Sequence, residues 1–434
     1  MTTSDTHRVI DAVWRIESAR IIAGLARILR DVGLAEELAQ DALVAALEKW
    51  PESGVPDNPG AWLTAVAKHR AIDLLRRSKL IERKHEDLGR ELEAEQFMAS
   101  TNFDTDAEDD VGDDLLRLVF TACHPVLSSD ARIALTLRLL GGLSTDEIAR
   151  AFLVPEPTVA QRIVRAKRTL TEAHVPFEVP RGDALAARLA SVLQVIYLIF
   201  NEGYSATAGD NWMRPALCEE ALRLGRILAE LTPKEPEVHG LVALMEIQAS
   251  RARARTGPSG EPILLFDQNR AHWDQLLIRR GLGALKRAEQ LGGTLGPYAL
   301  QAAITACHAR ARTPDETDWP RIAALYDALA QIAPSPVVDL NRAVALSMAF
   351  GPSVGLELVD ALTAEPSLKN YHLLPSVRGD LLVKLGRFDE AVVEFKRAAA
   401  LTRNTREREL LLERAAGCVR DSAQSAEAGQ SLDG

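Results

Sequence analysis

The sequence has few cysteines, and they are not spaced to bind one another or a metal. Its four cysteines lie far apart and form no Cys-x-x-Cys pair, which argues against a disulfide framework and a thiolate zinc site. Adjacent Cys-His pairs occur at 123–124 and 307–308. Neighbouring side chains on a helix point about 100° apart, so neither pair forms a chelating face. We therefore expect no bound metal.

Long apolar runs are also lacking. The longest, Val192–Phe200, includes Gln194 and is far shorter than the ~20 residues that cross a bilayer. The first residues, Met1–Asp5, lack the basic start and apolar stretch of a signal peptide. We expect a cytoplasmic protein that does not engage a membrane.

Strand-like alternation is nearly absent as well. Ala, Leu, Arg and Glu recur instead at helical spacing, so the sequence predicts an all-α protein. At about 100–200 residues per domain, a chain of 434 residues suggests two to four domains. We expect helices over 8–30, 34–49, 60–80, 113–123, 129–140, 145–153 and 157–171, and then amphipathic helices from 183 to about 417.

The net charge of −10 is concentrated in one segment. Residues 91–114 hold ten acidic residues and no Lys or Arg, so the rest of the chain sums to zero. Their low apolar content predicts a flexible linker, serving as a solvated spacer or lying in a basic channel of a partner. Basic faces can therefore exist elsewhere in this acidic protein.

Residues 144–170 have the pattern of a helix-turn-helix. Ser144 and Glu147 form a capping box at the start of a short helix, and Pro157 suits the start of the next one. The second helix has an apolar face and, opposite it, a polar and basic face that can enter a major groove. That face consists of Thr158, Gln161, Arg162, Arg165, Lys167 and Arg168. The alternative is a helical hairpin with a solvated basic face.

The helix expected at 60–80 also has two distinct faces. Its predicted core residues are Leu63, Ala67, Ala71 and Leu74. The polar side, with the preceding loop, offers Asn58, Trp62, His69, Arg70, Asp73, Arg76 and Arg77. An aromatic beside cations suits single-stranded nucleic acid, where bases stack and phosphates pair. For Trp62 alone, a packing role is the favoured alternative.

The last third contains a weak repeat. Residues 343–362 are similar to residues 380–401, with Gly351 and Gly386 as turns between helices. A helix–Gly–helix period near ~34 residues is typical of tetratricopeptide repeats. The alternative is an unspecialised helical bundle.

Two segments resemble bacterial extracytoplasmic-function (ECF) sigma factors. Residues 31–43 (DVGLAEELAQDAL) and 61–77 (AWLTAVAKHRAIDLLRR) resemble their region 2, and residues 139–149 and 158–167 resemble their region 4. Residues 200–204 (FNEGY), 267–270 (DQNR), 296–298 (GPY) and 340–344 (LNRAV) resemble the subgroup with a long helical C-terminal extension.

The resemblance implies a domain order and a role for each site. It implies region 2 at 1–90, the acidic linker at 91–114, region 4 at 115–180, a tetratricopeptide-like domain at 181–420 and a disordered tail at 421–434. Region 4 would recognise the −35 element through the basic face described above, and region 2 would capture the −10 element through the 58–77 set. The helix at 34–49 would bind core RNA polymerase through Glu36, Glu37, Gln40 and Asp41.

No catalytic or cofactor motif is visible, so we expect a protein that is not an enzyme and binds no cofactor. The resemblance implies a transcription initiation factor. Its expected partners are core RNA polymerase and promoter DNA, with a possible contact between the sigma regions and the C-terminal domain. Two rival interpretations are a polymerase-independent helix-turn-helix regulator and a tetratricopeptide-type adaptor. Asn201–Tyr204 could bind a ligand, although a Gly-terminated helix end is the favoured alternative.

Overall fold

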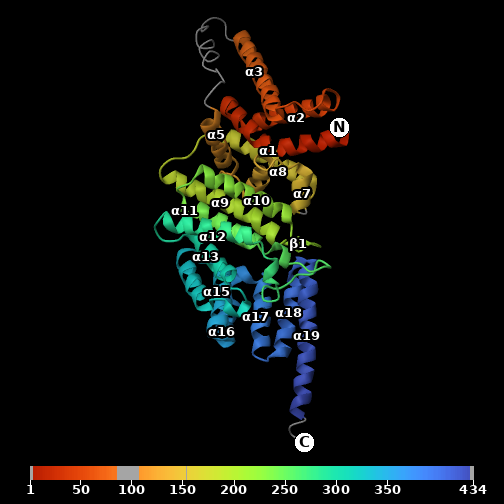
Figure 1. Cartoon of the computed structure of the whole chain (residues 1–434), viewed down its shortest axis with the longest axis vertical. Coiled ribbons are helices and arrows are strands. Elements are labelled where there is room, and N and C mark those ends of the chain that lie inside the picture. Colours follow the sequence, from red (N-terminus) through yellow and green to blue (C-terminus); the bar gives the residue numbers. More distant parts are fainter. Residues whose placement is uncertain (1–2, 86–106, 153, 431–434) are drawn as a thin grey trace. The chain divides into compact units, whose positions relative to one another are not determined.

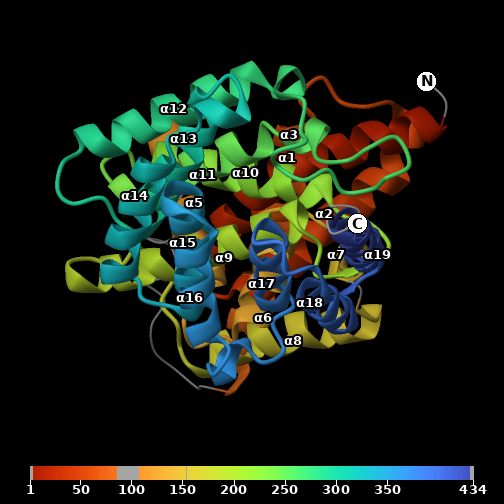
Figure 2. The same ribbon diagram turned by 90° about the horizontal axis from the view of Figure 1, so that it is seen from below.

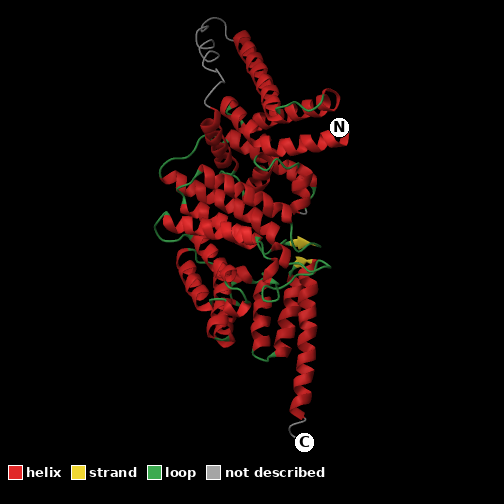
Figure 3. Ribbon diagram, in the orientation of Figure 1, coloured by secondary structure: helices red, strands yellow, loops and turns green. Residues whose placement is uncertain are grey.

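The computed structural model describes residues 3–85, 107–152 and 154–430, and this part of the chain is almost entirely helical (Figure 3). The all-α prediction is confirmed. The chain divides into two compact units, Met1–Ile196 and Tyr197–Gly434, with the division inside one long helix. Each unit is described by itself below.

Unit 1 begins with three helices that pack against one another, α1, α2 and α3 (Figure 1). They span Thr3–Leu29, Val32–Ser53 and Pro59–His85. Asp31 caps α2, because its Oδ1 accepts a hydrogen bond from the Leu34 amide at 2.9 Å. The helix α5, Ala107–Ala122, packs against α1 and contributes the fully buried Leu118 and Phe120 to the core.

Three further helices and the first part of a fourth, long helix complete this unit. The three are α6 (Ser129–Leu139), α7 (Thr145–Phe152) and α8 (Glu156–Glu172), and the long helix is α9 (Asp183–Tyr204). Among the described residues, α9 alone is long and apolar enough to cross a membrane, by length and composition only. Its side chains Val192, Val195 and Ile199 are almost fully buried, as in the core helix of a globular fold.

The prediction of a flexible linker over 91–114 is wrong for its last part. Residues 91–106 lie outside the described residues, whereas 107–114 belong to helix α5. Asp114 is buried there and pairs with Arg27 of α1 at 3.2 Å and with Arg117 at 2.6 Å. The carboxylate of Asp114 thus has guanidinium partners that the composition of the segment could not reveal.

Unit 2 is a succession of helices, most of them packed against the next in the chain (Figures 1 and 2). They are α10 (Pro215–Leu231), α11 (Pro236–Ala249), α12 (Gln275–Gln290), α13 (Pro297–Arg310), α14 (Trp319–Ile332), α15 (Pro336–Phe350), α16 (Pro352–Leu362), α17 (Leu373–Lys384), α18 (Phe388–Leu401) and α19 (Thr405–Gln430). Short 3-10 turns η1 (Ala252–Ala254), η2 (Arg270–His272), η3 (Pro314–Glu316) and η4 (Pro366–Leu368) lie between them.

Two short parallel strands tie the start of unit 2 to its end. The strand β1 (Ala208–Gly209) pairs with β2 (Arg403–Asn404). Asn404 is fully buried, and its Nδ2 donates to the carbonyls of Ala206 at 3.0 Å and Asn211 at 2.9 Å. The segment after α9 is therefore fixed to the segment before α19.

Both predicted turn glycines lie between paired helices. Gly351 separates α15 from α16 and Gly386 separates α17 from α18, with φ of 106° and 72°. Glycine adopts these angles readily, whereas other residues would be strained. The predicted helix–Gly–helix pairs are present.

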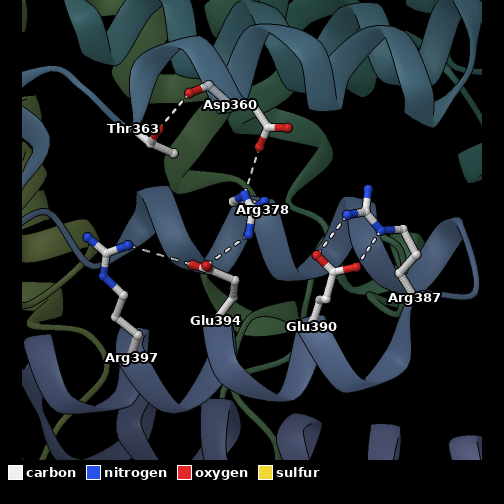
Figure 4. Close-up of polar contacts among 7 residues, drawn as sticks. All are labelled: Asp360, Thr363, Arg378, Arg387, Glu390, Glu394 and Arg397. Atoms are coloured by element: carbon white, nitrogen blue, oxygen red, sulfur yellow. Dashed lines mark hydrogen bonds and ion pairs between the residues drawn. The ribbon is translucent and has the colours of Figure 1, made fainter.

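Polar contacts also join these helices. Arg378 of α17 donates to Asp360 of α16 at 2.8 Å and to Glu394 of α18 at 2.9 Å (Figure 4). One guanidinium thus links three successive helices, and its planar fork suits two carboxylates at once. This pairing fixes the register of α16, α17 and α18.

Candidate nucleic-acid interface

The helix-turn-helix begins with the predicted capping box. The Ser144 amide donates to Glu147 Oε2 at 2.8 Å, and the Glu147 amide donates to Ser144 Oγ at 3.1 Å. These two bonds satisfy amides that a helix start leaves without partners. The box therefore fixes where α7 begins and how the chain enters it.

The helix α8 has the predicted buried face and a solvent-facing side opposite. Val159, Ile163, Ala166 and Leu170 are buried. Gln161, Arg165 and Arg168 are exposed, and Val164 between them is 64% exposed. Val164 was missed by the sequence interpretation, although its helical spacing from Gln161 and Arg168 places it on the same face. An exposed valine in such a face can contact a thymine methyl group.

The predicted cations of α8 differ in what they contact. Arg162 pairs with Asp130 of α6 at 3.0 Å, and Arg168 pairs with Glu172 at 2.6 Å. The hydrogen bond to Glu172 raises the pKa of Arg168 above its ordinary value. Arg165 forms no ion pair with any residue that the structure describes. Arg165 is therefore the cation of this face most available to a phosphate.

Glu36 does not lie where the sequence predicted. It was expected to be exposed for polymerase binding, but it is only 2% exposed. Its Oε1 accepts from Arg138 Nε of α6 at 2.7 Å, and its Oε2 forms an ion pair with Lys167 of α8. These cations come from helices about 100 or more residues away in the chain, so the spacing within α2 could not reveal them.

The remaining candidates on α2 do form an outer face. Glu37 and Asp41 are exposed and Gln40 is half-buried, and the exposed apolar residues Val44 and Leu47 continue the same side of the helix. Those two residues were missed, although they lie four and seven residues after Gln40 and therefore on its side of the helix. An exposed surface of acidic and apolar side chains is suited to a protein partner.

Two residues of the predicted −10 set have structural partners. Asn58 is exposed and caps α3, because its Oδ1 accepts from the Ala61 amide at 3.0 Å. Trp62 is half-buried and packs edge-on against the buried Trp50, with ring centroids 5.4 Å apart. This contact favours the packing role for Trp62.

The rest of that set follows the outer side of α3. His69, Asp73, Arg76 and Arg77 are exposed. Arg70 is half-buried and pairs with Asp41 of α2 at 3.0 Å, while Arg76 and Asp73 are 4.0 Å apart. Burial, with the nearby charge of Arg27, lowers the pKa of Lys68 on the same helix. The structure thus leaves four candidate side chains accessible on α3.

No cluster of three or more His, Cys, Asp or Glu side chains that could hold a metal occurs in the described ranges. The cysteine of each Cys-His pair, at 123 and 307, is buried as a free thiol. Burial raises the pKa of Cys123 to about 11 and, with the charge of Arg188, lowers that of His124 to about 4. Such a thiol does not readily become a thiolate.

Three parts of the chain match known sequence families. Residues 16–81 match sigma-70 region 2 and residues 117–170 match sigma-70 region 4. Residues 188–289 match a family of unknown function, DUF6596. The three matches occur in the order of α1–α3, α5–α8 and α9–α12.

Three relatives match different shares of this chain. An uncharacterised protein of Rhizobium meliloti (strain 1021) is 44% identical over 387 residues, which cover 89% of this chain and 90% of that protein. The probable ECF RNA polymerase sigma factor SigI of Mycobacterium tuberculosis (strain ATCC 25618 / H37Rv) is 25% identical over 170 residues, 39% of this chain and 57% of SigI. The ECF RNA polymerase sigma factor SigK of Mycobacterium ulcerans (strain Agy99) is 29% identical over 158 residues, 35% of this chain and 78% of SigK.

A capped helix-turn-helix that follows a three-helix region, with matches to sigma-70 regions 2 and 4, defines a sigma factor. Within that class, the chain belongs to the ECF sigma factors and carries a long helical C-terminal extension.

Proposed function

We propose that this sigma factor binds core RNA polymerase in the cytoplasm and directs initiation at a narrow set of promoters, without catalysing a reaction itself. The face of α8 would recognise the −35 element, and the outer side of α3 with its preceding loop would capture the −10 element. The α2 residues Glu37, Gln40 and Asp41, with Val44 and Leu47, would contact the polymerase.

One observation carries the proposal most directly. On α8, the exposed Gln161, Val164 and Arg165 lie opposite a fully buried apolar face. Amide and guanidinium groups can bond base edges or phosphates, and a methyl-bearing side chain can contact thymine. The buried face holds these groups on a rigid helix, so they are presented together to one groove.

The decisive experiment is run-off transcription with the full chain and purified core polymerase on a library of promoter fragments. We expect transcripts from a few promoters that share −35 and −10 elements, and none without core enzyme. Tight promoter binding by the free chain, with no transcripts, would support a polymerase-independent regulator instead. Absence of both DNA binding and transcription would support an adaptor.

The roles within α8 can be separated in the same assay. Arg165→Ala should weaken binding nearly equally for all promoter variants and reduce its salt dependence, since a phosphate contact releases counterions. Arg162→Ala should relax base preference by about 1–3 kcal/mol if it makes a bidentate base contact. Arg150→Ala on α7 is the control, because Arg150 is an exposed cation outside this face. Identical behaviour of Arg162→Ala and Arg165→Ala would contradict this division.

We further propose that the C-terminal extension regulates the sigma regions. Its helix pairs stack in order along the chain, an arrangement that in repeat proteins forms surfaces for peptides or protein segments. A tethered surface acts at high effective concentration, so a weak contact within the chain would be largely occupied.

A further inference from the structure

Three arginines and three aromatic rings alternate at the start of unit 2. We call this set the Arg–aromatic ladder, and its members in spatial order are Trp212, Arg255, Tyr204, Arg251, Trp273 and Arg270. The Tyr204 ring centroid lies 3.5 Å from Arg255 Cζ and 5.9 Å from Arg251 Cζ. The Trp273 ring lies 5.7 Å from Arg251 and 4.9 Å from Arg270. Each of these two rings is therefore shared by two cations.

None of the three ladder arginines forms an ion pair with an Asp or Glu among the residues that the structure describes. Most other buried charges here have such a partner, as Glu36 and Asp114 do. Glu316 raises the pKa of Arg270, but burial and the charge of Arg251 outweigh it and lower that pKa. The ladder thus carries positive charge that no adjacent carboxylate neutralises.

The hydrogen bonds of Arg270 account for its position. Its Nη1 donates to the carbonyls of His308 at 2.8 Å and Ala311 at 2.5 Å, at the C-terminal end of α13. A cation is favoured at the carbonyl end of a helix, so Arg270 has a structural role.

The other two arginines have fewer side-chain hydrogen bonds than Arg270, whose Nε is also without a partner. Arg255 is 7% exposed, yet the only hydrogen bond of its guanidinium group within the described part of the chain is from Nη1 to the Tyr204 carbonyl. Arg251 donates from Nη2 to Tyr204 Oη at 2.8 Å, and its buried Nε has no partner. The buried indole Nε1 atoms of Trp212 and Trp273 likewise lack an acceptor. Donors without acceptors therefore occur on both arginines next to Tyr204 and on the two tryptophans that contact these arginines.

Stacking on aromatic rings does not by itself offset the cost of burying these unpaired guanidinium groups. A cation–π contact contributes less free energy than the desolvation of an unpaired guanidinium costs. The surplus charge also acts on its surroundings: burial and the charges of Arg251 and Arg270 lower the pKa of His308 to about 4. The group that would balance the ladder is an anion.

We propose that Arg251 and Arg255, which both lie near the Tyr204 ring, bind a small oxyanion of the phosphate or carboxylate class. Their planar forks match the geometry of such oxygens, and their unused donors would each gain an acceptor. The half-buried Arg251 gives the anion access from solvent. Trp212 and Trp273 flank the site and would donate from their indole nitrogens.

The test is isothermal titration calorimetry of the full chain with sodium phosphate and, separately, sodium malonate, each against sodium chloride of equal ionic strength. We expect saturable binding of at least one of the two anions, with a change in tryptophan fluorescence. Arg251→Gln should weaken that binding about tenfold or more. Arg253→Gln is the matched control, because Arg253 is an exposed cation two residues away and lies outside the ladder.

Binding of phosphate alone or of malonate alone would support the proposed site and identify the class of anion that it binds. If circular dichroism shows that Arg251→Gln does not fold, Arg251→Lys replaces it. This variant keeps the positive charge but lacks the planar guanidinium fork, so it should also weaken binding. Absence of saturable binding to the wild-type chain would overturn the proposal. Equal binding by wild type and the Arg251 variant would overturn it too, leaving the ladder as a purely structural stack.

Discussion

At the scale of single residues, the two neighbours Lys167 and Arg168 illustrate how different two cations of one helix can be. The side chain of Lys167 is 18% exposed and pairs with the buried Glu36, whereas that of Arg168 is 77% exposed and pairs with Glu172 one turn along the same helix. Exposed pairs contribute little to stability because water screens them. Removing one partner of a buried carboxylate is costly, since the remaining charge loses compensation.

We therefore expect Lys167→Met to lower the free energy of unfolding by about 1–3 kcal/mol. Arg138 still pairs with Glu36 in that variant and limits the loss. Arg168→Met, the matched control, should leave the unfolding free energy almost unchanged. Urea denaturation followed by circular dichroism measures both. Equal effects of the two substitutions would show that the pair with Glu36 adds nothing to stability.

At the scale of elements, close helix crossings in unit 2 depend on particular glycines. A Cβ on Gly240 of α11 would lie 2.7 Å from the Ala299 amide nitrogen and 2.9 Å from Ala299 Cα, on α13. Both contacts are with backbone, which cannot rotate away as a side chain can. Gly283 of α12 is exposed, and nothing lies within 4 Å of its Cβ position.

Gly240→Ala should consequently destabilise unit 2 by about 1–3 kcal/mol, because α11 and α13 must move apart. Gly283→Ala should stabilise it by about 0.5–1 kcal/mol, since alanine loses less backbone entropy in a helix. Thermal unfolding followed by tryptophan fluorescence compares the two variants. A stabilising Gly240→Ala would mean that the crossing is looser than these distances indicate.

At the scale of the whole molecule, both units contain part of helix α9, so a truncated chain should keep this helix whole. Arg188 Nη2 donates to the Phe120 carbonyl and Ser191 Oγ to the Cys123 carbonyl, each at 2.7 Å, so unit 1 uses the first part of the helix. The last part carries Tyr204 of the ladder into unit 2. A cut near Pro180 would therefore remove contacts of region 4 itself.

If the extension regulates the sigma regions, a chain of residues 1–205 should transcribe at a different level from the full chain. Adding a second piece, residues 183–434, should restore the original level, because both pieces keep α9. Run-off transcription and a pull-down between the two pieces measure this. Equal transcription by residues 1–205 and the full chain, with no binding between the pieces, would mean that the extension serves an outside partner.

The amino-acid sequence by itself determined the features that depend on near neighbours in the chain. The helices, the Ser144–Glu147 capping box, the two faces of α8 and the turns at Gly351 and Gly386 follow from hydrogen bonds and side-chain spacings within a few residues. The helix end expected at 201–204 is also present, since α9 ends at Tyr204. Gly203 lies one residue before that end, with the Cys218 amide nitrogen 2.6 Å from its Cβ position.

Only the tertiary structure decided which charged groups are buried and by what they are compensated. From the sequence, Glu36 and Asp114 were expected to be exposed acidic side chains, and nothing in it indicated which groups surround the ladder arginines. Their surroundings come from helices and loops tens to more than a hundred residues away. Burial makes a charge depend on every group packed around it, and that set is fixed by how the helices fold together and not by the order of residues along any one of them.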